Sequence, residues 1–227
     1  QRLALVAYRG CVQPAPRAGV AVRLVCVADL HVHPWRLCSR DGGHDRLMDG
    51  LSVLRQSLDL ARSLGAAWVF AGDIKQPKNV WPQSALTGIH EILREFEDVQ
   101  KVMLAGNHDA WGEGGTGLAP FKDCANIIDT AYLAIEYGPP NTRMIFAPWD
   151  ADLDAVRKMV KQNPTAGLFA HGFIQGCMIG PEDVRIAKGT PVADYGNFPF
   201  AVFGDVHKGQ WREPGDPAKG RPAVWRA

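Results

Sequence analysis

Short hydrophobic runs alternate with longer amphipathic segments in the first half of the chain. Three of these runs, residues 23–28, 67–71 and 101–105, predict buried strands. Between them, residues 45–64 and 82–98 place hydrophobic residues at spacings of three and four, which predicts a helix with one buried face in each segment. The order of elements in this half is therefore strand, helix, strand, helix, strand.

The second half of the chain has a different rhythm. Residues 127–137 and 142–147 predict two strands around a Gly-Pro-Pro-Asn turn, and residues 150–162 predict a third helix. Further strands are expected over residues 166–170 and 200–203, and the Gly- and Pro-rich C-terminal end is expected to hold one or two edge strands. The whole pattern predicts an α/β fold, a four-layer α/β/β/α sandwich in which helices flank two mixed β-sheets.

Length and composition indicate one ordinary globular unit. A chain of 227 residues can form one substantial core. We expect an N-terminal extension over residues 1–20 and one domain over residues 21–227, with no evident capping domain. Hydrophobic residues make up 46% of the chain and charged residues 22%, which is typical of a soluble globular protein. The net charge of +1 neither indicates nor excludes a nucleic-acid partner, because a local basic patch can supply the charge that binding needs.

The cysteines and the hydrophobic runs indicate the compartment. Five cysteines at scattered positions, without any Cys-x-x-Cys, argue against a disulfide framework or a zinc site built from cysteines. This usage fits a reducing environment, so we expect a cytoplasmic protein. No hydrophobic run approaches the roughly 20 residues that cross a membrane, and no membrane contact is expected.

Five predicted strands are each followed by a potential metal ligand. The segments are Asp29-Leu30-His31, Gly72-Asp73, Gly106-Asn107-His108-Asp109, His171-Gly172 and Gly204-Asp205-Val206-His207. Asp29 and His31 are two residues apart, so in an extended segment both side chains point the same way, and the same holds for Asp205 and His207. In a fold of this kind, functional residues lie on loops beyond the carboxyl ends of strands. We therefore expect these side chains to converge on one rim.

The donor types in these segments indicate the metal and its chemistry. Carboxylate, imidazole and amide oxygen suit manganese, iron or zinc better than calcium, and magnesium is also possible. Two such ions about 3.5–4 Å apart would polarise a phosphoryl group and activate a water molecule near neutral pH. Asp73 is a candidate to bridge the two ions. Glycine before Asp73, Asn107 and Asp205 allows the backbone to turn sharply at the rim.

The order of the segments, D-x-H, G-D, G-N-H-D, H-G and G-x-x-H, resembles that of the calcineurin-like metallophosphoesterases. The resemblance runs from about residue 23 to residue 207, and G-N-H-D after a strand is its most specific part. It implies a hydrolase with two divalent metal ions. By this resemblance Asp29, His31, Asp73 and His207 hold the first ion, and Asp73, Asn107, His171 and Asp205 hold the second. It also implies that His108 is the general acid for the leaving oxygen, or stabilises the transition state.

The last segment indicates a subfamily. Residues 204–210, G-D-V-H-K-G-Q, are similar to the G-H-x-H-K-x-Q of SbcD-like DNA-repair nucleases. That similarity implies a DNA phosphodiester substrate, manganese as the metal and an SMC-type ATPase as a possible partner. Two positions depart from the pattern: Asp205 replaces a histidine, and Gln76 stands where these nucleases often have a histidine. The G-D-x-x-D-R-G and G-N-H-E of phosphoprotein phosphatases fit this chain poorly.

Residues near these segments are candidates for other roles. His33, Lys75 and Lys208 are candidate substrate contacts. Asp109 either orients His108 or forms a turn. Three tryptophans either stack on bases or pack against long loops, namely Trp35, Trp81 and Trp111.

Three functions remain open at this stage. The leading one is cleavage of DNA. The first alternative keeps the chemistry but acts on a small phosphodiester or nucleotide. The second is a non-catalytic scaffold that keeps the fold and binds a partner, with Asp205 as the sign of a lost activity.

Overall fold

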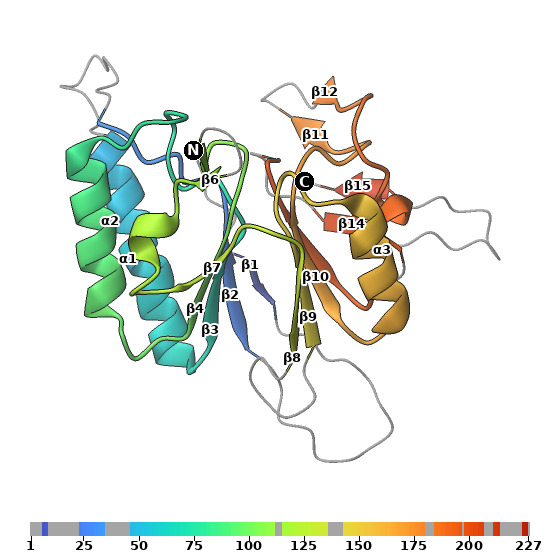
Figure 1. The fold of residues 1–227 in the computed structure, drawn as a ribbon, viewed down its shortest axis with the longest axis horizontal. Helices are drawn as coiled ribbons and strands as arrows, with labels where there is room; N and C mark the ends of the chain where they lie inside the picture. The colour runs from blue at the N-terminus through green and yellow to red at the C-terminus, as the bar shows by residue number, and fades with distance from the viewer. Residues whose placement is uncertain are drawn as a thin grey trace.

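Two β-sheets lie face to face, with helices on their outer sides (Figure 1). The computed structural model describes residues 6–8, 23–34, 46–111, 115–135, 143–179, 184–196, 198–206, 211–213 and 224–226. The helices α1 (Arg46–Leu64) and α2 (Gln83–Glu95) cover the first sheet, and α3 (Leu153–Gln162) covers the second. The predicted four-layer α/β/β/α sandwich is confirmed.

The first sheet has the strand order β1-β2-β3-β4-β7. Its strands are β1 (Val6–Tyr8), β2 (Leu24–Val27), β3 (Ala67–Phe70), β4 (Lys101–Leu104) and β7 (Asn126–Ile128). Strands β2, β3, β4 and β7 run parallel, and β1 pairs antiparallel with β2. The carboxyl ends of the four parallel strands therefore lie at the same edge of the sheet.

The second sheet has the strand order β13-β10-β9-β8. Its strands are β8 (Tyr132–Ile135), β9 (Arg143–Ala147), β10 (Gly167–His171) and β13 (Ala201–Gly204). Strand β10 runs parallel to both β9 and β13, and β8 pairs antiparallel with β9. Smaller elements complete the described chain: β5 (Ala110–Trp111) with β6 (Gly115–Thr116), β11 (Met178–Ile179) with β12 (Val184–Arg185), β14 (Trp211–Glu213) with β15 (Val224–Arg226), and the 3-10 helices η1 (Ala119–Phe121) and η2 (Val192–Tyr195).

The hydrophobic strands divide their side chains between two cores, because successive residues of a strand point to opposite faces. On β2, Leu24 and Cys26 lie between the two sheets in one cluster with Phe146 and Phe169. Val25, the residue between them, belongs to the cluster formed with α1 and α2. A strand buried on both faces is uniformly hydrophobic, which is why these runs are recognisable in the sequence.

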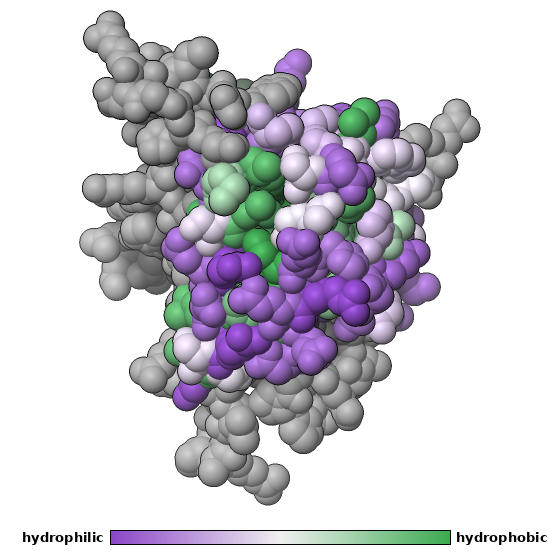
Figure 2. All heavy atoms as spheres, turned by 90° about the vertical axis from the view of Figure 1, so that its left-hand side faces the viewer, coloured by the Kyte–Doolittle hydropathy of each residue, from purple (hydrophilic) through white to green (hydrophobic). Residues whose placement is uncertain are grey.

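The helices have one buried and one exposed face. Residues Leu54 and Leu58 of α1 and Ile89 and Leu93 of α2 are fully buried against the sheet. Figure 2 looks onto this side of the molecule and shows a mostly hydrophilic surface with a hydrophobic strip in its upper part. No helix of the described chain is long and hydrophobic enough to cross a membrane.

Three predicted element boundaries need correction. Helix α2 ends at Glu95 rather than at residue 98. The single strand predicted over residues 127–137 is wrong: β7 ends at Ile128, β8 begins at Tyr132, and the two strands belong to different sheets. The polar pair Asp129-Thr130 lies where the chain passes from one sheet to the other. Helix α3 begins at Leu153 rather than at residue 150, because the Asp152 carboxylate accepts a hydrogen bond from the Asp154 amide and caps the helix.

The N-terminal part also differs from the expectation. Strand β1 lies within the predicted extension, yet it pairs with β2 along Val6 to Tyr8. The division at residue 20 stays a prediction, as does the absence of a capping domain. The predicted turn over residues 138–141 lies outside the described residues.

Candidate metal centre

The segments that follow β2, β3, β4, β10 and β13 meet where the carboxyl ends of both sheets come together. The Asp205 amide, after β13, donates to Asp29 Oδ1 at 3.0 Å, which joins a loop of the second sheet to a loop of the first. In the same way His171 Nδ1, at the end of β10, donates to the carbonyl oxygen of Ala71 at 2.7 Å. The structure therefore brings residues from five separate parts of the chain to one rim.

The backbone of this rim is strained. Among the described residues, five other than glycine have a positive φ. Four of them are predicted ligands, namely Asp29 (φ 57°), His31 (φ 46°), Asp73 (φ 63°) and Asp205 (φ 80°). The left-handed conformation costs an ordinary residue about 1–2 kcal/mol, and such strain is concentrated at functional sites.

The extended geometry predicted for Asp205 is wrong, because its φ is 80°. It is also wrong for Asp29 and His31, since both residues are left-handed. Their loop instead continues to pair with the loop after β3. The amides of Asp29, His31 and Val32 donate to the carbonyl oxygens of Gly72, Asp73 and Ile74 at 2.9, 3.0 and 2.7 Å. These bonds fix the positions of the side chains after the regular strands have ended.

Asp73 lies at the centre of two groups of potential ligands. One group is Asp29, Asp73 and His171, and the other is His31, Asp73 and His108. The ligand atoms within each group lie within 4.8 Å of one another. His171 Nε2 is 3.5 Å from Asp73 Oδ1, and His31 Nε2 is 3.7 Å from Asp73 Oδ2. The two carboxylate oxygens thus face different partners, as a carboxylate that bridges two ions requires.

Buried polar atoms in this centre fit metal ions. Among the described residues, Asp73 Oδ2, Asn107 Oδ1 and His171 Nε2 are buried without a hydrogen-bond partner. A buried polar atom that stays unpaired costs about 1–3 kcal/mol, and a bound cation would remove this cost. Because His171 Nδ1 donates to a carbonyl, the neutral ring has its lone pair on Nε2, facing the centre, as in metal-binding histidines.

The electrostatics also favour a divalent cation. Burial raises the pKa of Asp29 to about 7, although the nearby His171 acts to lower it. Burial disfavours a charged His171, but the negative carboxylates of Asp73 and Asp29 outweigh this and raise its pKa to about 9. Burial also acts to raise the pKa of Asp73, and the interaction with His171 more than compensates and lowers it. A cation that binds between carboxylates crowded in a buried site stabilises their charged forms.

The hydrogen bonds of Asp109 show whether this residue orients His108. Its fully buried carboxylate accepts from the amides of Asp73 (2.7 Å), Ile74 (3.2 Å) and Gly106 (3.0 Å). Burial, reinforced by the neighbouring Asp73 carboxylate, raises its pKa to about 6. Asp109 therefore joins the two loops that carry Asp73 and Asn107, and it supports the ligands rather than His108.

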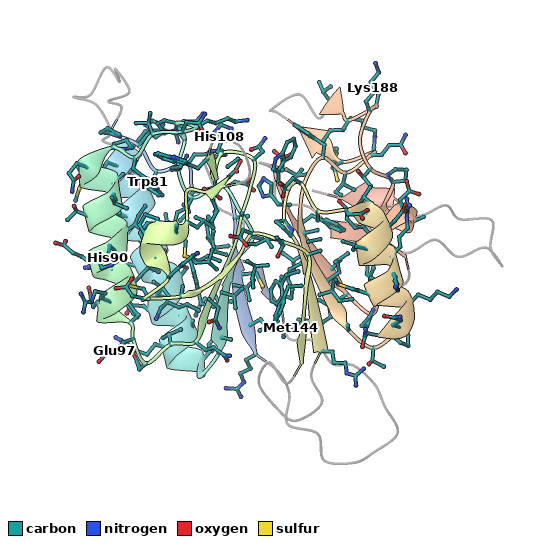
Figure 3. All side chains as sticks on the ribbon, in the orientation of Figure 1. Trp81, His90, Glu97, His108, Met144 and Lys188 are labelled. Carbon is teal, nitrogen blue, oxygen red and sulfur yellow. The ribbon has the colours of Figure 1, made fainter. Side chains whose placement is uncertain are left out.

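His108 is held from two sides. Its amide donates to Asp73 Oδ1 at 2.8 Å, and its ring Nδ1 donates to the backbone carbonyl of Gln76. The ring lies edge-on to that of His31, with 4.8 Å between centroids. Because a backbone carbonyl orients the ring, the side chain at position 76 is not needed for this contact. Figure 3 shows His108 at the upper end of the first sheet, where the ligand loops lie.

Lys75 has a different environment from that of a substrate contact. Its side chain is fully buried, and its ammonium group donates to the carbonyl oxygens of Pro77 and His108. It also lies 5.7 Å from the centre of the Trp81 ring. Burial lowers the pKa of Lys75, against the attraction of Asp109 and Asp73. Lys75 therefore ties the loop after β3 to the backbone of His108.

The remaining candidate residues are either buried, exposed or outside the described part of the chain. His33 is buried, with 4% of its surface exposed, so it does not face solvent in this structure. Trp81 packs against neighbouring loops, which is one of the two roles predicted for it. Its Nε1 donates to the carbonyl oxygen of Gly117, and its ring contacts Phe121 edge-on. Trp111 is 42% exposed. Three predicted residues, Trp35, His207 and Lys208, lie outside the described residues, so the roles proposed for them stay predictions.

A pocket beside the centre contains residues that the sequence analysis missed. It has a volume of about 340 Å³, and His171 and Gly172 form part of its wall. The exposed aromatic side chains of Trp149 and Phe173 and the buried Tyr195 also line it. The Trp149 amide donates to the carbonyl oxygen of Ala105, just before the G-N-H-D segment. The available signals were Phe173, directly after His171-Gly172, and Trp149, two residues after the end of β9.

Residues 22–195 match the family model of the calcineurin-like phosphoesterases, and this chain belongs to that family. The members of this family are metal-dependent phosphoesterases that bind divalent metals in a dinuclear site. Nothing in the fold or in the described geometry disagrees with this assignment. A search of curated protein sequences found no match.

The solved structures that are similar to this chain include a nucleotidase and a nuclease. One is a 5′-nucleotidase precursor from Thermus thermophilus, with a TM-score of 0.42 and 12% identity over 68% of this chain and 38% of that chain. The other is the nuclease MPE of Pseudomonas putida, with a TM-score of 0.39 and 13% identity over 82% of this chain and 88% of that chain. This chain thus spans 38% of the length of the nucleotidase. At these values neither similarity bears on the substrate.

Proposed function

We propose that this phosphoesterase is a DNA nuclease of the SbcD-like type, which hydrolyses phosphodiester bonds with two Mn²⁺ ions. The observation that carries the proposal is the aromatic pocket beside the metal centre. Trp149 and Phe173 are each 46% exposed and line the same pocket as the candidate ligand His171. Exposed aromatic rings are the usual platforms on which proteins stack unpaired bases. The sequence G-D-V-H-K-G-Q adds support through its similarity to SbcD-like nucleases.

The residues of the centre have different roles in catalysis: some bind the metal ions and one transfers a proton. Asp29, His31, Asp73 and His207 would hold one ion and Asp73, Asn107, His171 and Asp205 the other, with Asp205 as a carboxylate in place of histidine. Bound ions would supply Lewis-acid stabilisation of the charge that develops on the phosphoryl group. The chain itself supplies His108, whose Nε2 is the ring nitrogen left available because Nδ1 is bonded to Gln76. With both ring nitrogens protonated, His108 can donate the Nε2 proton to the departing oxygen and remain as the neutral ring with Nδ1–H bonded to Gln76.

The supporting residues keep this geometry in place. Asp109 fixes the loops of Asp73 and Gly106, and Lys75 fixes the backbone of His108. Positioning of this kind matters because a displacement of about 1 Å can lower a rate about 10²-fold. The strained backbone at Asp29 and Asp73 can persist only because these contacts hold it.

The proposal is tested first with bis-p-nitrophenyl phosphate and Mn²⁺, and then with single-stranded DNA, duplex DNA and cyclic nucleotides. We expect hydrolysis of the small ester and cleavage of DNA. Trp149→Ala and Phe173→Ala are expected to weaken DNA cleavage roughly tenfold, while hydrolysis of the small ester changes little, because only DNA offers bases to stack. Tyr132→Ala is the matched control, since Tyr132 is an aromatic residue that is 51% exposed on β8.

Other outcomes would identify the alternatives. Hydrolysis of cyclic nucleotides without cleavage of DNA would replace the nuclease with an enzyme for small phosphodiesters. A protein without metal-dependent hydrolysis of any ester would be a scaffold. If DNA cleavage is found, a cytoplasmic location and an SMC-type ATPase partner are the further expectations, and co-purification with such an ATPase tests the second.

A further inference from the structure

A second cluster of metal-binding side chains lies away from the dinuclear centre. It consists of His90 on α2 and of Asp123 and Cys124, which follow η1. Figure 3 shows His90 on the outer helix layer, well below the end of the sheet where His108 lies. Because His90 and Cys124 are 34 residues apart, no local sequence pattern indicates the cluster.

The three side chains present one nitrogen, one oxygen and one sulfur atom to the same point. His90 Nε2 lies 3.3 Å from Asp123 Oδ1, and Cys124 Sγ lies 3.3 Å from the same oxygen. The third side of the triangle, from Cys124 Sγ to His90 Nε2, measures 3.7 Å. All three pairs of atoms therefore lie within hydrogen-bonding distance of one another.

These spacings match the corners of a tetrahedron around zinc. Zn–S of about 2.3 Å and Zn–N and Zn–O of about 2.1 Å imply ligand separations of about 3.4 Å for nitrogen and oxygen and about 3.6 Å for pairs with sulfur. The observed separations of 3.3, 3.3 and 3.7 Å agree with these values to within about 0.3 Å. The side chains of His90 and Asp123 are 30% and 57% exposed, so an ion can reach the cluster from solvent, and a water molecule can complete the tetrahedron.

The geometry points to a separate metal site in which His90 Nε2, Asp123 Oδ1 and Cys124 Sγ bind one zinc ion. The mixed ligand set of thiolate, imidazole and carboxylate suits zinc. The ion would connect α2 to the segment between η1 and β7. This inference is independent of the proposed nuclease function.

Zinc binding at this site releases the thiol proton of Cys124. In the metal-free protein, burial and the hydrogen bond to Asp123 raise the pKa of the Cys124 thiol to about 11. Zinc therefore displaces the thiol proton to solvent when the Zn–S bond forms, and affinity increases with pH. His90 binds as the neutral imidazole.

Cobalt(II) titration of the full-length protein tests the site. A thiolate bound to Co²⁺ gives a near-ultraviolet charge-transfer band, and the predicted dinuclear centre contains no cysteine. The dinuclear centre also takes up Co²⁺, so we expect the final intensity of the band to correspond to one thiolate-bound Co²⁺ per chain, and the band to disappear when Zn²⁺ is added. The band should be absent from Cys124→Ser and should persist in Asp73→Asn. In His90→Ala, the apparent affinity for Co²⁺ should fall roughly tenfold or more.

Two further variants keep the test decisive. Cys177→Ser is the matched control, because Cys177 is another described cysteine and lies in the core beside α3, remote from His90. Asp123→Asn changes a side chain that is largely exposed, so it should fold and lose affinity even if Cys124→Ser is unstable. Absence of the band from the wild-type protein, its survival in Cys124→Ser, or an unchanged affinity in Asp123→Asn would overturn the inference.

Discussion

Gly72 should tolerate no side chain, and Gly72→Ala is the most direct probe of the metal centre. Its φ of 97° lies in the left-handed region, directly before Asp73. A Cβ at this position would lie 2.7 Å from Cγ of the His171 ring and 2.9 Å from the Cα of Gly106. The substitution therefore disturbs the backbone and a candidate ligand together.

The two effects have different magnitudes. The backbone effect costs about 1–2 kcal/mol in the free energy of unfolding, because an alanine here must adopt the left-handed conformation. Ordinary contacts to a Cβ begin at 3.4 Å, so the close-packed imidazole has to move by roughly 1 Å. That movement breaks the bond from His171 Nδ1 to Ala71 and displaces Nε2 from the centre. We expect the loss of one bound metal ion and a decrease in turnover of about 10²-fold or more.

Gly65→Ala separates the two effects. Gly65 also has a left-handed φ, of 55°, but a Cβ there would meet nothing within 4 Å. Both variants should lose stability in urea denaturation of the metal-free protein, and Gly72→Ala should lose more, because it also breaks the bond from His171 Nδ1 to Ala71. Only Gly72→Ala should lose metal, measured by elemental analysis after dialysis, and hydrolysis of bis-p-nitrophenyl phosphate. A Gly72→Ala protein with full metal content and wild-type turnover would refute the placement of His171 at the centre.

Three further predictions concern the residues around the centre. His108→Ala should abolish turnover and leave metal content nearly unchanged, and loss of metal as well would make His108 a ligand. Lys75→Met should lower the free energy of unfolding by about 3 kcal/mol, because two backbone carbonyls lose a charged donor, and should lower turnover as well. Lys101→Met is its control: Lys101 is also buried and donates to two carbonyls, so stability should fall while turnover does not. Metal binding requires an ionised Asp29 and a neutral His171, whose pKa values are raised to about 7 and about 9. Affinity for Mn²⁺ should therefore fall as pH decreases below about 9, by about tenfold per unit for each proton displaced, and calorimetry that finds a constant affinity would contradict this.

Some features of the fold are visible in the sequence because they depend on local chemistry. A strand that is buried on both faces is mostly hydrophobic, so β2 and β3 appear as uninterrupted runs and β4 has a single polar residue, Lys101, at its start. A polar residue directly after such a run must lie at the edge of a sheet. That relation is enough to identify Asp29, Asp73 and Asp205 as candidate ligands.

Other features depend on contacts between distant residues, and the sequence does not reveal them. The Asp109 carboxylate accepts from the amides of Asp73, Ile74 and Gly106, and the first two are separated from it by 36 and 35 residues. The burial of Lys75 likewise follows from how two loops pack, since a lysine near a glycine-containing turn is usually exposed.

The sequence by itself determined the order of strands and helices, the four-layer architecture and the types of ligand at the strand ends, because hydrophobic periodicity and donor chemistry are local properties. Tertiary structure alone decided that β7 and β8 belong to different sheets, that Asp29 and His31 adopt a left-handed backbone, and that Trp149 and Phe173 line one pocket with His171. These features arise when the two sheets pack face to face, because only then do loops from both sheets exchange hydrogen bonds and exclude water from a shared centre.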